Sequence, residues 1–349
     1  MTNSVRIVAL LVGSALGTLP DIRAHAVESR AIQPVEAHGL QTEAPDTTSR
    51  PLLIAPAHPV NGSLIRITVA QKWGCSAPSE FTGTLAGQPL HFERDENGRC
   101  VALAAIPIDS VHSVTARVMR ANLTGGVDTL ATRIVVTAAR YPTERLRVAP
   151  QFGSTPDSAL EARTAREAAQ ALAVARQAHE TPKLWRGAFR APRPGRVTSG
   201  FGRARQFNGE LQSRHMGTDF AGAEGAPVRA SNRGVVALIA QFYYGGQVVY
   251  LDHGAGLVTG HMHLSTVSVA TGDTVERGDI IGRVGSTGRV TGPHLHWVVR
   301  YGEVSVNPLS LLNLTKAPAA RRPRRGQGAG STATVLVPSR TGEPLATAS

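Results

Sequence analysis

The stretch His294-Leu295-His296-Trp297-Val298-Val299-Arg300-Tyr301 joins two histidines to a run of apolar residues. The apolar run predicts a β-strand, and residues i and i+2 of a strand face the same side. His294 and His296 should therefore project together into one space. A second stretch, His215-Met216-Gly217-Thr218-Asp219, offers a further imidazole and a carboxylate at H-x-x-x-D spacing.

These side chains predict a metal site. The chain has 12 histidines, but clustering alone is weak evidence, because a lone histidine is more often a core or surface residue than a ligand. The spacing is the stronger argument. A catalytic zinc ion takes three protein ligands and keeps one position for water, and two histidines with one aspartate meet that count. The remaining histidines could orient the water, relay its proton or stabilise an oxyanion.

The sequence around these motifs is β-like and rich in glycine from residue 184 to residue 314. Strand candidates lie at residues 235–239, 247–251, 280–284 and 297–301. A second group of short β-like runs, separated by turn residues, predicts a small β-sandwich beside which Trp73 and the two cysteines should lie; these runs are residues 64–69, 101–106, 113–118 and 131–136. We therefore expect a mainly β protein.

One helix is expected between the two β regions. Thr155-Pro156 is a favourable helix start, and alanines and a leucine then recur at steps of three and four. The expected apolar stripe is Ala165, Ala168, Leu172 and Ala175. It should be a connecting helix that lies against a domain.

From about residue 197 to residue 312 the chain resembles the lysostaphin-like (LytM-type) zinc endopeptidases of peptidoglycan. The shared motifs run in order along the chain: Ser199-Gly200-Phe201-Gly202, His215-Met216-Gly217-Thr218-Asp219-Phe220, Gly225-Ala226-Pro227-Val228, Asp252-His253-Gly254, His263-Leu264-Ser265, Gly272-Asp273-Thr274-Val275, Gly278-Asp279-Ile280-Ile281-Gly282, Gly285-Ser286-Thr287-Gly288, Gly292-Pro293-His294-Leu295-His296 and Val306-Asn307-Pro308-Leu309. The resemblance implies an antiparallel β catalytic domain with the metal at the end of a groove.

The resemblance also assigns roles to single residues. It implies one zinc ion bound by His215, Asp219 and His296, with His263 and His294 as catalytic histidines that do not bind the metal. His261 competes with His263 for the first of these two catalytic positions, and the distance to Gly272 favours His263. Asn208 lies where family members shape the substrate groove and is a candidate substrate contact, whereas His253 is interpreted as a structural residue in a turn.

The domain plan that follows is a signal peptide (1–26), a linker (27–50), a β-sandwich (51–145), the connecting helix (155–182), the zinc metallopeptidase domain (183–315) and a disordered basic tail (316–349). A short apolar stretch that ends in Ala24-His25-Ala26 supports the signal peptide, and it predicts a periplasmic or secreted protein. No later segment is expected to span a membrane.

The net charge is +12 and comes almost wholly from arginine, which favours polyanionic surroundings such as nucleic acid, anionic lipid or acidic wall polymers. No nucleic-acid-binding module is recognised, so nucleic acid is not an expected partner. The arginines of the tail could contact an anionic cell-envelope surface, or the tail could simply be solvated. Cys75 and Cys100 are the only cysteines, and in an oxidising compartment they would form a disulfide rather than remain two buried thiols.

The function that these features predict is hydrolysis of peptide crosslinks in bacterial peptidoglycan. The expected bond joins D-alanine to diaminopimelate, and a glycine bridge is the other candidate. A non-enzymatic activator of cell-wall amidases is the alternative function, since some relatives have lost metal ligands. All the ligand positions are filled here, which favours the enzyme.

Overall fold

The computed structural model describes residues 50–122, 125–153 and 156–315, with the backbone alone at 210–212. These residues are mostly β, and the strands pair antiparallel except where β9 meets β11, so the expected fold class is confirmed. No helix among the described residues is both long enough and apolar enough to cross a bilayer. The proposed signal peptide, most of the proposed linker and the basic tail lie outside the described residues.

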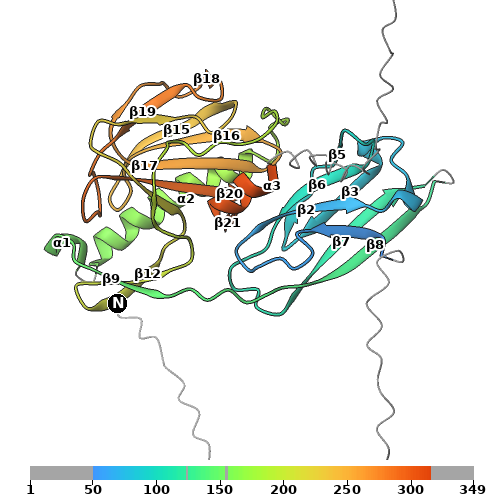
Figure 1. Cartoon of the computed structure of the whole chain (residues 1–349), viewed down its shortest axis with the longest axis horizontal. Coiled ribbons are helices and arrows are strands. Elements are labelled where there is room, and N and C mark those ends of the chain that lie inside the picture. The colour runs from blue at the N-terminus through green and yellow to red at the C-terminus, as the bar shows by residue number, and fades with distance from the viewer. Residues whose placement is uncertain (1–49, 123–124, 154–155, 316–349) are drawn as a thin grey trace, which may run out of the picture. The chain divides into compact units, whose positions relative to one another are not determined.

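The first β region is a sandwich of two four-stranded sheets (Figure 1). One sheet has the order β1-β2-β6-β5 and contains Leu52–Ala55, Leu64–Val69, Cys100–Ala105 and Glu93–Arg94. The other has the order β4-β3-β7-β8 and contains Gln88–Pro89, Phe81–Leu85, Ser113–Ala121 and Val127–Val135. We call these eight strands the sandwich.

Strand β2 explains how the sandwich is packed. Ile65, Ile67 and Val69 alternate along it and belong to the core between the two sheets. Leu64 points the other way and joins Ala105 in the core of the second β region. Because the strand is buried on both faces, its sequence is a nearly continuous run of apolar residues.

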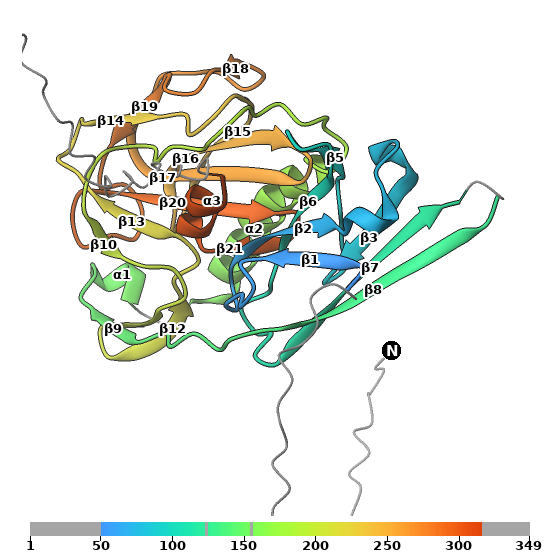
Figure 2. The same cartoon turned by 45° about the vertical axis from the view of Figure 1, so that its right-hand side comes forward.

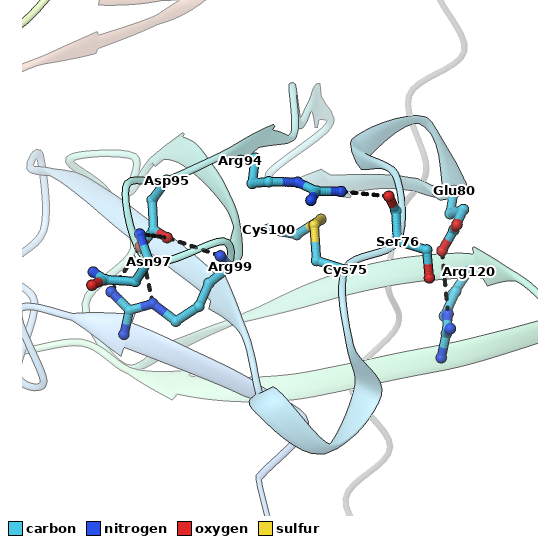
Figure 3. The surroundings of a disulfide bond; sticks show 9 residues. All are labelled: Cys75, Ser76, Glu80, Arg94, Asp95, Asn97, Arg99, Cys100 and Arg120. Atoms are coloured by element: carbon cyan, nitrogen blue, oxygen red, sulfur yellow. Dashed lines mark hydrogen bonds and ion pairs between the residues drawn. A yellow bond between two sulfur atoms is a disulfide. The ribbon is translucent and has the colours of Figure 1, made fainter.

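The two cysteines form a disulfide (Figure 3). Cys75 lies between two short 3-10 helices, η1 (Gln71–Trp73) and η2 (Pro78–Glu80), and Cys100 begins β6. Their Cα atoms are 5.5 Å apart. The disulfide ties the irregular η1–η2 segment, which has few backbone partners, to a buried strand.

The second β region, which we call the C-terminal domain, is built on a ten-stranded antiparallel sheet. Its main path is β10-β13-β20-β17-β16-β15-β18, formed by Val197–Ser199, Thr218–Ala221, His294–Tyr301, Leu257–Val267, Gly246–Gly254, Gly234–Phe242 and Thr274–Val275. Three further strands pair beside this path: β14 (Pro227–Arg229), β19 (Ile280–Val284) and β21 (Val304–Val306). The predicted strand at residues 297–301 thus forms the end of β20, which also contains both histidines of the H-x-H motif.

Two helices pack on this sheet (Figures 1 and 2). Helix α2 (Ser158–Gln177) contacts β15, β16 and β17, and α3 (Pro308–Thr315) contacts β20 and β2. The expected connecting helix is therefore present, but its predicted apolar stripe is partly wrong. Ala165 and Ala168 are exposed, and the buried side chains of α2 are Ala171 and Ala175.

A fourth, small sheet lies next to the C-terminal domain. It has the order β12-β11-β9 and is formed by Glu210–Arg214, Ala204–Phe207 and Thr143–Leu146, and a one-turn helix, α1 (Pro150–Gly153), follows β9. Strand β9 runs parallel to β11, with Glu144 opposite Arg205. The segment that leaves the sandwich is thus fixed beside the strands that precede His215.

Candidate metal centre

The three predicted ligands meet at one point in the interior. Strand β13 pairs with β20 so that Asp219 stands directly opposite His296, and opposite residues of an antiparallel pair share a face. His215 lies just before β13. Its Nε2 atom is 3.0 Å from Asp219 Oδ1 and 2.9 Å from His296 Nδ1, while His296 Nδ1 is 2.7 Å from the same carboxylate oxygen. We call His215, Asp219 and His296 the ligand cluster.

The donor set of the ligand cluster fits a cation. The Nδ1 atom of His215 is 2.8 Å from the carbonyl oxygen of Gly200, so Nδ1 carries the proton of the neutral ring. Its Nε2 atom then directs a lone pair at Asp219 Oδ1, an arrangement that is repulsive unless a positive ion lies between the two atoms. A carbonyl that fixes the ring tautomer is also the usual outer partner of a metal-bound histidine.

Burial and hydrogen bonding prepare these groups for a metal. Burial works to raise the pKa of Asp219, but the adjacent His215 and His296 rings outweigh it and hold that pKa well below its usual range. Burial lowers the pKa of His296 to about 4. At neutral pH the cluster therefore contains an ionised carboxylate and a neutral His296 imidazole, which are the forms that bind metals.

Three residues that the sequence did not single out hold the cluster in place. The Nη2 atom of Arg205 donates to Asp219 Oδ2 at 2.7 Å, which leaves Oδ1 for the histidines. The Oγ atom of Ser199 is 3.1 Å from His215 Nδ1 and donates to Glu144 Oε2 at 2.7 Å. Ser199 belongs to a motif that carried the resemblance, whereas Glu144 reaches the site from β9 and shows no local signal.

His294 and His263 lie beside the cluster, and a hydrogen bond to a backbone carbonyl fixes the Nδ1 atom of each ring. His294 Nδ1 donates to the Gly292 carbonyl at 2.8 Å, and its Nε2 is 3.7 Å from Asp219 Oδ1. His263 Nδ1 donates to the Thr287 carbonyl at 2.8 Å. The His263 ring centroid is 4.9 Å from that of His294 and 5.8 Å from that of His296. In the neutral form each ring therefore keeps an Nε2 lone pair that can accept a proton.

His261 and His263 take different surroundings although they are two residues apart in β17. A regular strand would place both on one face, but His263 has φ +63°, in the left-handed region that non-glycine residues rarely adopt. His263 reaches the other histidines, while His261 is fully buried and faces the Val249 carbonyl. Burial lowers the pKa of His261 to about 3.

The other two sequence candidates lie away from the ligand cluster. Asn208 lies at the turn between β11 and β12, and its side chain bonds both the N–H and the carbonyl of Val148, at 3.1 and 3.3 Å. His253 lies within β16 rather than in the expected turn. Its Nδ1 donates to the Arg233 carbonyl and its Nε2 accepts from Thr259, both at 2.8 Å, which is a structural arrangement.

A cavity of about 310 Å³ opens beside the cluster. It is lined by residues of β9, β10, β11 and β13, of the loop before β20 and of the start of β20, among them Glu144, Arg205, Phe207, Asp219, Arg289 and His294. Since Asp219 and His294 form part of its wall, a molecule in this cavity would touch the ligand cluster.

Comparison with known proteins places this geometry in context. Residues 213–308 match the model of Peptidase family M23, and this range includes the ligand cluster, His263 and His294. The DD-carboxypeptidase/endopeptidase Mpg of Neisseria meningitidis is 45% identical over 97 residues, which are 28% of this chain and 22% of that protein. The peptidoglycan DD-endopeptidase ShyA of Vibrio cholerae is 48% identical over 83 residues, which are 24% of this chain and 19% of that protein. The match thus covers about a fifth of the length of each of these two curated relatives.

Among solved structures, a Pseudomonas aeruginosa protein assigned to peptidase M23 is similar over a wider range. It shares 27% sequence identity with a TM-score of 0.57, covering 73% of this chain and 96% of that protein. This similarity therefore extends beyond residues 213–308.

Proposed function

We propose that this chain, whose residues 213–308 match the model of Peptidase family M23, is a zinc-dependent endopeptidase that hydrolyses peptide crosslinks of bacterial peptidoglycan. The observation that carries the proposal is the ligand cluster, in which two imidazole nitrogens and one carboxylate oxygen converge within 3.0 Å of one another. We assign the metal to His215, Asp219 and His296. A zinc ion held by three such ligands supplies a Lewis acid and makes water nucleophilic near neutral pH.

The other residues of the site have separate tasks in this proposal. His263 and His294 each direct an Nε2 lone pair into the site, so either can take the proton of the attacking water and return it to the leaving amine. Once protonated, the same nitrogens can donate to the oxygen that develops negative charge. Arg205 and Ser199 keep Asp219 and His215 in position. Asn208, at the turn between β11 and β12, is proposed as a substrate contact.

The substrate and the location complete the proposal. The two curated relatives named above have names that specify DD-peptide bonds, which favours the D-alanine–diaminopimelate crosslink. Such a substrate lies outside the cytoplasmic membrane, so we propose a periplasmic or secreted protein whose signal peptide is residues 1–26. The basic tail at residues 316–349 would contact an anionic envelope surface.

The direct test is digestion of purified peptidoglycan by the full chain, followed by separation of the muropeptides. Zinc-loaded wild type should convert crosslinked dimers to monomers, and a chelator should stop the conversion until zinc is restored. His215→Ala should lower the rate by at least about 10²- to 10³-fold, the scale of losing one group that stabilises the transition state. Metal content gives an independent readout, and Arg233→Gln, at a half-buried residue whose side chain pairs with Glu276, is the control. Identical profiles from wild type and His215→Ala would rule the proposal out.

A further inference from the structure

We propose that the cavity beside the ligand cluster, here called the arginine pocket, binds a free carboxylate carried by the substrate next to the scissile amide, and that Arg289 recognises it. This inference rests on the proposed function, because it names a chemical feature of the same substrate. The arginine pocket is lined by Arg205 and Arg289 together with Glu144, Phe207, Asp219 and His294.

The first argument is the pairing of charges around the pocket. Glu144 lies 3.3 Å from Arg203 and 3.5 Å from Arg205, and Arg205 also pairs with Asp219 at 2.7 Å. Arg289 differs from these groups. Within the described side chains, which leave out residues 210–212, no carboxylate lies within 4.0 Å of its guanidinium. Among the described side chains, Arg289 is therefore a positive group of the pocket that a ligand can pair with.

The second argument is the way in which Arg289 is held. Its guanidinium lies 4.0 Å from the ring centroid of Phe207 and 4.1 Å from that of Tyr244. A weak polar contact, at 3.3 Å, joins its Nη2 atom to Ser213 Oγ. The aromatic contacts fix the guanidinium, while its in-plane N–H groups can form the paired hydrogen bonds that suit a carboxylate.

Burial makes this cation receptive to an anion. Burial lowers the pKa of Arg289 to about 10, and the positive charge of Arg205 acts in the same direction. Arg289 therefore remains charged at neutral pH but is poorly solvated. A carboxylate placed beside it would restore the lost solvation and offset the repulsion between the two arginines.

The third argument is position. Arg289 donates its backbone N–H to the Tyr244 carbonyl at 2.9 Å, and Thr287, two residues earlier, accepts from His263. Gly288 between them has φ +76°, and a Cβ there would lie 2.4 Å from the Gly246 nitrogen. One tightly packed loop therefore fixes the positions of both His263, a proposed catalytic histidine, and Arg289. This keeps the carboxylate site at a fixed distance from the ligand cluster.

The chemistry of the bond suggests where such a carboxylate comes from. In a D-alanine–diaminopimelate crosslink, the residue that supplies the amide nitrogen carries a free α-carboxylate. An uncrosslinked peptide that ends in D-alanine also places a carboxylate next to its last amide. A glycine bridge has no charged group there, so this pocket would disfavour it.

The experiment compares matched pairs of synthetic peptides that carry either a carboxylate or a neutral carboxamide at that position, one pair crosslinked and one pair ending in D-alanine. Zinc-loaded wild type should hydrolyse the carboxylate form of at least one pair with a kcat/KM about 10- to 100-fold higher, the range expected for a charged hydrogen bond. The pair that shows the preference identifies the source. Arg289→Gln should reduce the preference to within about twofold. Arg289→Lys keeps the positive charge but loses the paired N–H donors of the guanidinium, so its preference should lie between those of wild type and Arg289→Gln. Arg233→Gln should behave as wild type.

A general loss of structure in Arg289→Gln would slow both forms equally and leave their ratio unchanged, so a retained preference in this variant overturns the inference. Equal hydrolysis of both forms by wild type overturns it as well and leaves the proposed function standing. Calorimetric binding of the same peptides in the presence of zinc is the second measurement. If no peptide is hydrolysed but the carboxylate form still binds more tightly to wild type than to Arg289→Gln, the proposed function fails and the carboxylate site remains.

Discussion

The sandwich and the C-terminal domain are both antiparallel β structures, but their interiors differ in kind. The sandwich core is apolar, and its buried polar residues within the described part of the chain are Asn61, Thr68 and Thr132, none of which titrates near neutral pH. The C-terminal domain buries a set of titratable side chains: His215, Asp219, Asp252, His253, His261, His263 and His296. Similar strand geometry therefore supports two different interiors.

The difference shows what a buried imidazole requires. A polar group removed from water is costly unless it is paired. His253 meets this requirement with a carbonyl and a hydroxyl, and the ligand cluster meets it with a carboxylate and the proposed metal. The sandwich contains no comparable buried groups in its described residues, so its stability should depend on apolar packing and on the disulfide. Each half should accordingly respond to a different perturbation.

Acid should give the largest effect, and it should act on the C-terminal domain. Burial lowers the pKa of His253 from 6.5 to about 4 and that of His261 from 6.5 to about 3. The unfolded chain binds protons below pH 6.5 while the folded protein does not, so the stability that these neutral rings contribute is complete above pH 6.5 and falls as the pH drops toward 4. We expect a loss of about 3 kcal/mol for each histidine between pH 6.5 and pH 4.

Guanidinium unfolding across this pH range, in chelator so that metal release adds nothing, measures the loss. In His253→Gln the number of protons taken up on unfolding in acid should fall by about one, which makes the free energy of unfolding less dependent on pH. This holds whatever the substitution does to stability at pH 7. His58→Gln alters an exposed histidine of the sandwich segment and serves as the matched control. If the free energy of unfolding of His253→Gln changed with pH as steeply as that of wild type, the buried imidazole would not be the source of the acid sensitivity of the C-terminal domain.

The sequence predicts the apolar strands of both halves well, because their pattern is local. The expected ranges 64–69 and 280–284 coincide with β2 and β19, and the H-x-H motif lies on a strand as the spacing requires. Helix α2 is less well predicted because alanine is abundant on several of its faces. Asp157 caps the observed helix, whereas Thr155, the expected capping residue, lies outside the described residues.

The supporting residues of the site could not be predicted, since their contacts are not local. Glu144 lies 55 residues before Ser199, to which it is hydrogen-bonded. The left-handed backbone of His263 breaks the two-residue alternation on which a strand prediction relies. Spacing could therefore indicate which side chains are candidate metal ligands, while the tertiary fold alone decides which groups hold them in place.

Loss of the disulfide should give the next largest effect, and it should act through the sandwich. Cys75 and Cys100 are separated by 25 residues, and a crosslink that closes a loop of this length stabilises a protein by about 3.5 kcal/mol in the chain-entropy model. The Cys75→Ala, Cys100→Ala double variant should lose about 2–4 kcal/mol in guanidinium unfolding at pH 7. Its kcat/KM should stay at the wild-type value at temperatures where it remains folded.

Reductant provides the internal control for this comparison. It should destabilise wild type by a similar amount and leave the double variant unchanged, because the variant has no bond to break. If removal of the disulfide lowered kcat/KM while stability was retained, the sandwich would contribute to the site itself, and the division between the two halves would have to be redrawn.

The smallest effect is expected at helix α2, which packs against strands of the C-terminal domain. Asp157 Oδ1 accepts the N–H of Leu160 at 2.8 Å and so satisfies one free donor at the helix start. Asp157→Ala should cost about 1 kcal/mol, whereas Asp157→Asn keeps an acceptor oxygen and should cost only a few tenths through the helix dipole.

Because α2 buries a narrow face of alanines against β15, β16 and β17, the loss at Asp157 should appear as faster amide exchange in the helix while the sandwich strands keep their protection. Asp109→Ala, at an exposed aspartate of the sandwich segment, should stay within about 0.5 kcal/mol of wild type. Equal loss of protection in both halves after Asp157→Ala would mean that they open as one cooperative unit. The contrast between the two interiors would then describe their chemistry but not their separate stabilities.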